Sequence, residues 1–232
     1  MGPDEERLAN NAIEYIKTNV NLIIKRFADD SLFLSYNNPA SVFMAGSPGA
    51  GKTEFSKRLI KNFETVVRID PDEIRDILPD YDGKNSFIFQ GAASLGVNKL
   101  HDYVLKYKKN FILDGTFSNY ERSRDNVKRS LDKGRPVLIY YVYQGPIIAW
   151  DFTQKREALE GRHIPKEIFI KDFFMAKDAV DKVKVDFGNN IEVDLVVKDF
   201  TANTERIELN IEKIDNYLKV DYDKEKLERL LT

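Results

Sequence analysis

One segment of the sequence has the residue pattern of a phosphate-binding loop. The pattern is Gly-x-x-x-x-Gly-Lys-Thr, and its eight residues are Gly46, Ser47, Pro48, Gly49, Ala50, Gly51, Lys52 and Thr53. Glycines allow backbone N–H groups to turn toward phosphate oxygens, and the start of the following helix adds positive potential. We expect Lys52 to contact the β- and γ-phosphates of ATP and the Thr53 hydroxyl to hold Mg²⁺. The alternative is a glycine-rich turn without a ligand.

A carboxylate follows the second strand that we expect, at residues 65–69. Asp72 comes just after it, in a short helix that Pro71 begins. Ligands of open α/β sheets lie beyond the carboxyl ends of the strands, and a kinase needs a carboxylate to orient and deprotonate the acceptor hydroxyl. We therefore expect Asp72 to be the catalytic base, and Arg75, one turn further, to bind an anionic part of the acceptor. The alternative is that Asp72 only caps the helix.

Two further carboxylates have a comparable place in the sequence. Asp70 ends the same strand, and Asp114 ends the apolar strand 111–113. A carboxylate at Asp114 can hold Mg²⁺ through water or orient the acceptor, and Gly115 with Thr116 would let the backbone approach a ligand. We expect Asp70, Asp114 and Thr116 to bind the acceptor, and Asp114 to serve the metal as well. An ordinary Asp-Gly turn is the alternative for Asp114.

The most basic segment near these residues runs from Lys155 to Lys166. Phosphoryl transfer spreads negative charge over the equatorial oxygens, and arginines on a mobile segment stabilise that charge. Gly161 offers a hinge, so we expect Arg156 and Arg162 to be catalytic arginines on a lid. A solvent-exposed charged face is the alternative, because such runs usually face water.

Strands and helices alternate along the chain, so the fold class that we expect is α/β, with a parallel sheet covered by helices. The expected strands are residues 41–45, 65–69, 111–113, 137–143 and 191–197. The expected helices are residues 4–28, 52–62, a short one from 71, 86–106, 119–132, 147–159, 165–187 and 205–231. We divide the chain into an N-terminal helical extension (1–39), a P-loop kinase core (40–200) and a C-terminal helical tail packed on the core (201–232).

The bulk composition limits the classes of protein. Hydrophobic residues make up 42% of the 232 residues, enough for one α/β domain. The 36 Lys and Arg residues nearly balance the 38 Asp and Glu residues, and this net charge of −2 argues against long nucleic acid as a partner. The chain has no cysteine, which excludes disulfides and thiolate metal sites. We find neither a targeting segment nor a membrane-length apolar run, and we expect a cytoplasmic protein.

The phosphate loop alone does not separate kinases from switch GTPases and motor ATPases. The guanine-reading pattern Asn-Lys-x-Asp is missing, because residues 98–102 have the wrong spacing. The chain is also short for a ring-forming ATPase. Elimination therefore favours a small kinase.

Taken together, the motifs resemble the zeta-toxin family of bacterial toxin–antitoxin kinases over residues 40–198. The matching segments, in order, are Gly46–Thr53, Ile69–Asp72, Asp114–Thr116, Lys155–Glu157 and Gly161–Lys166. The phosphate loop is unspecific by itself, but the set in this order is specific. The chain departs from the family pattern in two respects. Asp114 stands where the family usually has glutamate, and the two lid arginines lie closer together in sequence.

The resemblance implies ATP-dependent 3′-phosphorylation of UDP-N-acetylglucosamine or a related UDP-sugar, and a parallel sheet in the order 2-3-1-4-5. It assigns Lys52 to the ATP phosphates and Thr53 to Mg²⁺. It also assigns Asp72 to the catalytic base, and Arg156 and Arg162 to the charge of the transition state. A small helical antitoxin that covers the nucleotide site is the partner that the resemblance implies.

Three other functions stay open on the sequence. A polynucleotide or nucleoside 5′-kinase would share the spacing of Asp72 and Arg75. A nucleotide-binding interaction module with little turnover is the second, and the retained Lys52, Thr53 and Asp72 argue against it. A kinase that inactivates a small molecule, such as an antibiotic, through its hydroxyl is the third.

Overall fold

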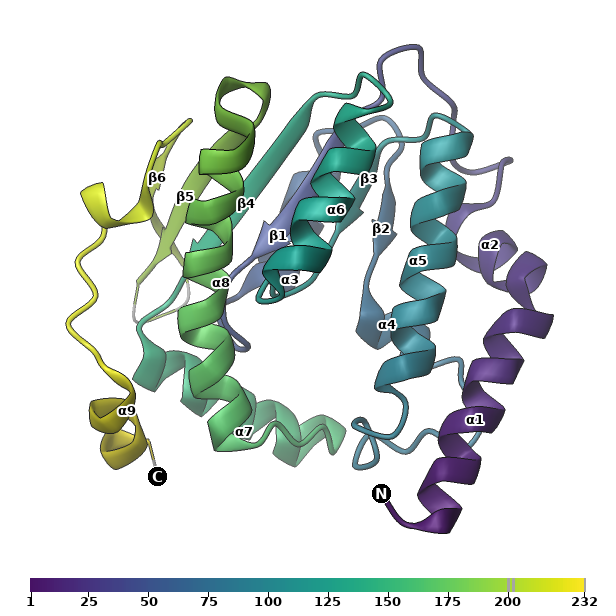
Figure 1. Ribbon diagram of the computed structural model, residues 1–232, viewed down its shortest axis with the longest axis horizontal. Helices are drawn as coiled ribbons and strands as arrows, with labels where there is room; N and C mark the ends of the chain where they lie inside the picture. The colour runs from purple at the N-terminus through teal and green to yellow at the C-terminus, as the bar shows by residue number, and fades with distance from the viewer. Residues whose placement is uncertain (200, 202, 232) are drawn as a thin grey trace.

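A single sheet connects most elements of the structure, a computed structural model that describes residues 1–199, 201 and 203–231. Within these residues the sheet has six strands in the order β2-β3-β1-β4-β5-β6 (Figure 1). The strands are β1 (Ser41–Ala45), β2 (Val67–Ile69), β3 (Phe111–Leu113), β4 (Val137–Tyr143), β5 (Glu192–Lys198) and β6 (Thr204–Glu208). The first five are parallel, and β6 pairs antiparallel with β5. The expected parallel order 2-3-1-4-5 is therefore confirmed, with one antiparallel strand added.

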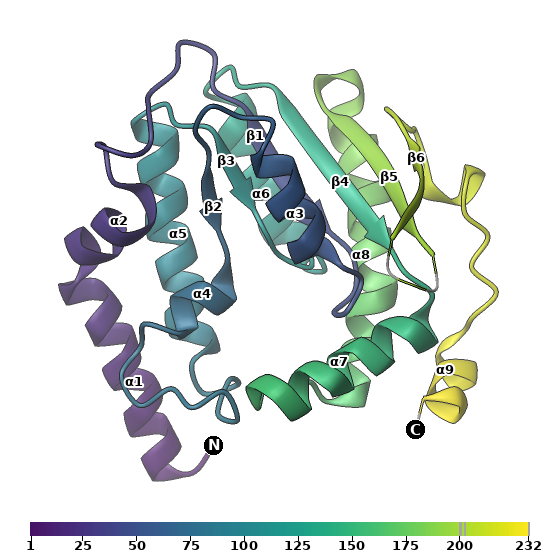
Figure 2. The same ribbon diagram turned by 180° about the vertical axis from the view of Figure 1, so that it is seen from behind.

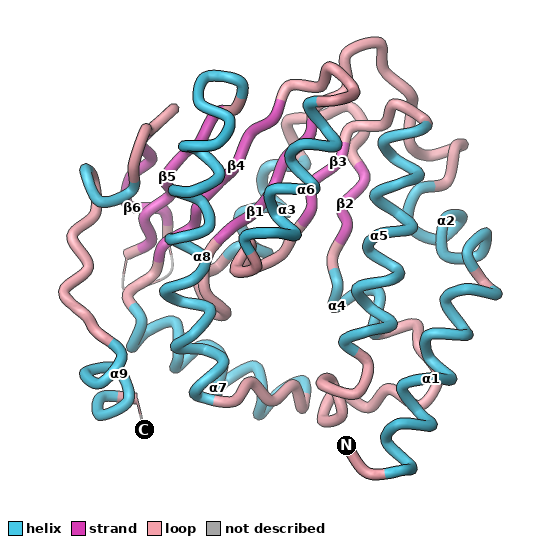
Figure 3. Tube along the Cα trace, viewed as in Figure 1, coloured by secondary structure: helices cyan, strands magenta, loops and turns pink. Residues whose placement is uncertain are grey.

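Helices cover both faces of the sheet, as the alternating pattern predicts. Helices α5, α6 and α8 lie over one face in Figure 1, and α3 lies over the other face in Figure 2. The helices are α1 (Pro3–Thr18), α2 (Val20–Ala28), α3 (Lys52–Ile60), α4 (Pro71–Arg75), α5 (Gln90–Lys106), α6 (Tyr120–Leu131), α7 (Pro146–Glu160), α8 (Lys166–Phe187) and α9 (Lys224–Leu230). Two short 3-10 turns are η1 (Gly188–Asn190) and η2 (Ile214–Asn216). Figure 3 shows this alternation along the trace.

The central strand β1 is buried along its whole length. Phe43 and Ala45 pack in the larger core, whereas Val42 and Met44 pack in the core that includes Phe55 of α3. A strand with a core on each face is a continuous apolar run, because no side chain points to water. β1 is thus the rigid support from which the phosphate loop departs.

The expected single helix 4–28 is wrong at Asn19, where α1 ends and α2 begins. Asn19 has φ −110° and ψ 23°, and its Nδ2 donates to the Tyr15 carbonyl oxygen at 2.9 Å. The neighbouring Thr18 hydroxyl donates to the Glu14 carbonyl oxygen, also at 2.9 Å. Such side chains compete with the backbone for helical carbonyl groups, which explains the interruption. Both helices pack on α5.

The expected helical tail 205–231 is also wrong over most of its length. Residues Thr204–Glu208 form the edge strand β6, and a helix returns only at Lys224–Leu230. The strand was hidden in the sequence because an edge strand with both faces near solvent has no apolar alternation. The end of this tail packs on the molecule, since Leu227 and Leu231 are buried beside α7 and α8.

Two elements lie beyond the carboxyl ends of the strands. α4 follows β2 and α7 follows β4, and they stand on opposite sides of this end of the sheet (Figures 1 and 2). Each begins with a proline, whose fixed φ suits the first turn of a helix.

In the described residues no helix is long and apolar enough to cross a membrane. The division into parts 1–39, 40–200 and 201–232 stays a prediction, and its boundary residues 200 and 232 lie outside the described residues.

Replacing Phe43 by alanine should lower the free energy of unfolding by about 3–5 kcal/mol, because the ring is buried and lies edge-on to Phe111 and Phe117. Urea denaturation followed by circular dichroism measures the change. Phe87→Ala is the control, since Phe87 is 60% exposed and the loss of its ring should change stability little. Equal losses for both variants would contradict this account of the core.

Candidate active site

The phosphate loop has the tight backbone that its glycines predict. Gly46 has φ +135° and Gly49 has φ +72°, a range that side chains rarely adopt. A Cβ atom on Gly46 would overlap the Val142 carbonyl oxygen, and one on Gly49 would overlap the Ala149 carbonyl oxygen. The loop therefore packs against the end of β4 and the start of α7, with no space for a side chain at either glycine.

Lys52 lies inside this loop. Its Nζ donates to the Ser47 carbonyl oxygen at 2.7 Å. Burial lowers the pKa of Lys52 to about 8, although the negative charge of Asp114 acts in the opposite direction. Arg162 and Asp72 also act on this pKa, so the ammonium group lies among the expected site residues.

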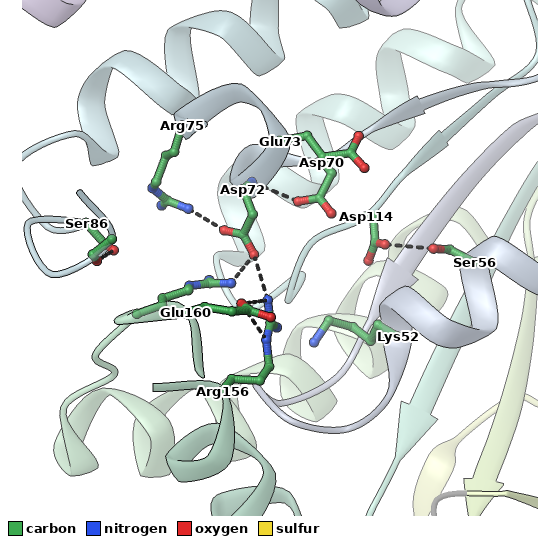
Figure 4. Close-up of polar contacts among 12 residues, drawn as sticks. Lys52, Ser56, Asp70, Asp72, Glu73, Arg75, Ser86, Asp114, Arg156 and Glu160 are labelled. Atoms are coloured by element: carbon green, nitrogen blue, oxygen red, sulfur yellow. Dashed lines mark hydrogen bonds and ion pairs between the residues drawn. The ribbon is translucent and has the colours of Figure 1, made fainter. Parts of the chain in front are cut away.

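Three arginines surround the carboxylate of Asp72 (Figure 4). Arg75 Nη1 donates to Asp72 Oδ1 at 2.6 Å, and Arg162 Nη1 donates to Asp72 Oδ2. Arg156 Nη2 lies 3.8 Å from the same Oδ2. Arg75 is nearly fully buried and also donates to Gln90 Oε1. The structure thus brings together Asp72 and all three arginines that the sequence singled out.

The helix cap at the end of β2 is Asp70. Its Oδ1 accepts a hydrogen bond of 2.8 Å from the backbone N–H of Asp72, which leaves both carboxylate oxygens of Asp72 to the arginines. Burial and the neighbouring charges of Asp72 and Asp114 raise the pKa of Asp70 to about 7. Arg68 forms an ion pair with Asp70, but it is shared with other carboxylates and does not offset these effects.

The carboxylate of Asp114 is buried against two residues that the sequence analysis did not single out. Its Oδ2 accepts from Ser56 Oγ at 2.7 Å and from Arg68 Nε at 3.1 Å. Arg68 also pairs with Glu73 of α4. One sequence signal could have identified Arg68, because residues two apart in a strand share a face, which directs Arg68 and Asp70 to the same side.

The segment after α7 approaches the loop before α5. Arg162 follows Gly161, which ends α7 with φ +75°. On the other side, a Cβ atom on Gly83 would lie 2.6 Å from the Glu160 carbonyl oxygen. The two segments therefore touch, and Arg162 extends from one of them to Asp72.

Thr116 and Thr53, the other two residues expected in the site, lie next to and within the phosphate loop. The Gly46 N–H donates to the Thr116 carbonyl oxygen at 3.1 Å, and the Thr116 hydroxyl lies 2.9 Å from Ser118 Oγ. Thr53 is in the first turn of α3. In the part of the chain that the structure describes, no group of three or more His, Cys, Asp or Glu side chains could hold a metal ion.

The parallel sheet, the intact phosphate loop and the carboxylate among arginines define a P-loop kinase. The family model described as zeta toxin matches residues 24–221, and the chain belongs to that family. No curated protein sequence gives a match to the chain.

Solved structures with the same fold cover most of the chain. One comes from the PezAT chromosomal toxin–antitoxin system of Streptococcus pneumoniae, with a TM-score of 0.65, 16% identity, and coverage of 99% of this chain and 93% of that chain. The AvrRxo1-ORF1:AvrRxo1-ORF2 complex with ATP has a TM-score of 0.58, 14% identity, and coverage of 94% and 74%. The Pnkp1/Rnl/Hen1 RNA repair complex has a TM-score of 0.52, 18% identity, and coverage of 82% and 54%. At these identities the likeness concerns the fold.

Gly49→Ala should weaken ATP binding at least about 10-fold, because the added Cβ forces the loop away from Ala149 and strains a left-handed residue. Isothermal titration calorimetry with ATP measures this. Gly134→Ala is the matched control, since Gly134 also has a positive φ of 66° but a Cβ there meets nothing within 4 Å. Unchanged ATP affinity in Gly49→Ala would contradict the close fit of the loop.

Proposed function

We propose that the protein transfers the γ-phosphate of ATP to a hydroxyl of UDP-N-acetylglucosamine or a related UDP-sugar, at the 3′-hydroxyl of the amino sugar. The observation that carries this proposal is the position of the Asp72 carboxylate at the start of α4. Lys52, at the start of α3, lies at the same end of the sheet (Figure 4). A base and a phosphate-binding lysine in this arrangement suit transfer to an alcohol between them.

On the nucleotide side, residues 46–53 would surround the phosphates with backbone N–H groups. Lys52 would give up its bond to the Ser47 carbonyl for the β- and γ-phosphates. The residues present fit Mg²⁺, which commonly takes one or two protein oxygens plus phosphate oxygens and water. Thr53 would supply its hydroxyl directly, and Asp114, whose Oδ2 accepts from Arg68 and Ser56, would act through water. The ion when bound would neutralise charge on the phosphate oxygens.

On the acceptor side, Asp72 would take the proton of the hydroxyl. The acceptor oxygen then forms its bond to the γ-phosphorus, and the bond from that phosphorus to the ADP oxygen breaks. Both oxygens of Asp72 are paired with arginines, so the acceptor hydroxyl must replace one of them. Arg162 is the partner to be replaced, because its segment begins at the Gly161 hinge, whereas Arg75 is buried.

Arg156 and Arg162 would move from Asp72 to the transferring phosphoryl group. Guanidinium groups stabilise the charge on its equatorial oxygens, and here they come from the end of α7 and the segment after it. ATP would therefore both supply the phosphate and withdraw the arginines from the base. Because the arginines leave Asp72 only when ATP is bound, ATP would bind before the acceptor hydroxyl contacts Asp72.

Arg75 supports an anionic acceptor. Its Nε is buried and has no hydrogen-bond partner among the described residues. Burial lowers the pKa of Arg75, although Asp72 acts against this effect, so a further negative charge nearby would be favourable. A diphosphate such as that of a UDP-sugar supplies it. We assign Asp70 and Thr116 to the same acceptor side.

A small helical antitoxin is the partner that we propose, with the nucleotide side of the site as its surface. Support comes from family membership and from structures of the PezAT toxin–antitoxin system and the AvrRxo1-ORF1:AvrRxo1-ORF2 complex, which share the fold. We propose a cytoplasmic location, where ATP is abundant.

An acceptor panel tests the proposed function. The protein is incubated with γ-labelled ATP, Mg²⁺ and, separately, UDP-sugars, oligonucleotides, nucleosides and a metabolite extract, and products are identified by mass. Label on a UDP-sugar is the expected result. Label on a 5′-hydroxyl would favour a polynucleotide or nucleoside kinase, which the Asp72–Arg75 pair also suits. Transfer to no acceptor would overturn the proposal.

Asp72→Asn should abolish phosphoryl transfer and leave ATP affinity within about 2-fold of wild type, because the amide cannot take the proton while the phosphate loop is intact. Product formation and calorimetric ATP binding measure the two effects. Asp76→Asn, one residue past α4, is the control and should retain activity. Full turnover in Asp72→Asn would refute the base assignment.

Arg162→Ala should lower kcat by about 10³-fold if Arg162 stabilises the transferring phosphoryl group. Steady-state kinetics with saturating ATP measures this effect. Arg124→Ala removes a surface arginine paired with Asp186 and should leave kcat unchanged. A normal kcat in Arg162→Ala would identify Arg162 as a surface charge.

A further inference from the structure

We infer that Arg68 is a positioning residue that holds the helix of the catalytic base at a fixed place relative to the helix of the phosphate loop. This inference rests on the proposed function, because it takes Asp72 as the base. Arg68 lies on β2 between α3 and α4, and its side chain is only 8% exposed. Its guanidinium contacts three carboxylates and one hydroxyl, on four different elements or their ends.

The first link leads from Arg68 to α3. Arg68 Nε lies 3.1 Å and Nη2 lies 3.0 Å from Asp114 Oδ2, so both donate to one oxygen at the end of β3. The same oxygen accepts from Ser56 Oγ at 2.7 Å, and Arg68 Nε also donates to Ser56 Oγ at 3.2 Å. Ser56 Oγ also lies 3.0 Å from the Thr53 carbonyl oxygen, so its one hydroxyl hydrogen is shared between that oxygen and Asp114. Arg68 thereby reaches the first turn of the phosphate-loop helix.

The second link leads from Arg68 to α4. Its Nη2 pairs with Asp70 Oδ2, while the other oxygen of Asp70 accepts from the backbone N–H of Asp72. Its Nη1 pairs with Glu73. Both contacts hold the first turn of α4, and that turn carries the base. Because Asp70 is a bridge between Arg68 and the Asp72 backbone, a shift of Arg68 would move Asp72 itself.

The balance of charge explains why this one residue matters. Three carboxylates surround one guanidinium, and two of them, Asp70 and Asp114, are almost completely buried. Without Arg68 these carboxylates would repel each other or take up a proton, and the contacts that join α3 and α4 through them would be lost. Lysine keeps the charge but has no planar fork, so it cannot bind all three groups in this geometry.

Arg68→Lys is the test variant. It should lower kcat by about 10²-fold, the effect expected of a displacement of about 1 Å in the reacting groups. The Kd for ATP should stay within about 2-fold, because the phosphate loop is unchanged. The amide of Asp72 should exchange its hydrogen at least about 10-fold faster, since its bond to Asp70 loosens. This exchange, measured by NMR, needs no acceptor and so stands apart from the proposed function.

Arg135→Lys is the matched control. Arg135 is also a buried arginine, and it donates to Ser41 Oγ and to the carbonyl oxygens of Ala40 and Lys109, at the amino ends of the strands. Its replacement should cost stability without changing kcat or the exchange of the Asp72 amide. Should Arg68→Lys fail to fold, Glu73→Gln is the second variant. It weakens the ion pair between Arg68 and the half-exposed Glu73, and it should lower kcat by about 3- to 10-fold.

The outcomes separate the two claims. A wild-type protein that phosphorylates no acceptor overturns the proposed function, and Asp72 exchange still tests Arg68. Normal kcat and normal Asp72 exchange in Arg68→Lys overturn the inference. A kcat loss of the same size in Arg135→Lys, or a loss of ATP affinity that accounts for the whole effect in Arg68→Lys, would overturn it as well.

Discussion

The carboxylate of Asp72 receives guanidinium groups from three places in the chain, and this interaction joins the parts of the site. Arg75 comes from the same helix, Arg156 from the end of α7, and Arg162 from the segment after Gly161. Arg156 and Arg162 therefore connect the carboxyl end of β2 with α7 and the segment after it, whereas Arg75 holds the Asp72 carboxylate within α4. In the reaction that we propose, these charges separate again, because a carboxylate paired with arginines is a poor acceptor for the proton of an alcohol.

The two sides of the site differ in how firmly they are held. On the sheet side, buried Arg68 connects Asp70 with Asp114 and Ser56, and every one of these groups has a fixed partner. On the other side, Arg156 is 40% exposed and lies near the end of α7, a helix that Gly161 caps. This difference suits the phosphoryl transfer that we propose, since an acceptor and a γ-phosphate must be aligned before charge develops.

Much of the fold could be predicted from sequence, because buried parallel strands are continuous apolar runs and the phosphate loop depends on local glycine chemistry. Elements defined by tertiary context could not. The edge strand Thr204–Glu208 has a single apolar residue, Ile207, and the break at Asn19 depends on side-chain bonds within one turn. The contacts of Arg68 could not be predicted either, because its partners Ser56 and Asp114 lie far apart in the chain. The roles of the other site residues stay predictions, although the structure brings these residues together.

The most direct measurement is a crystal structure of the protein with Mg²⁺, a non-hydrolysable ATP analogue and UDP-N-acetylglucosamine. The account predicts that the γ-phosphate lies on Lys52 and the loop amides, with Arg156 and Arg162 turned toward it. It also predicts a sugar hydroxyl within about 2.6–3.2 Å of an Asp72 oxygen, on the side of the γ-phosphorus. A bound nucleotide with Asp72 still paired to Arg162, or an acceptor with no hydroxyl near Asp72, would contradict it.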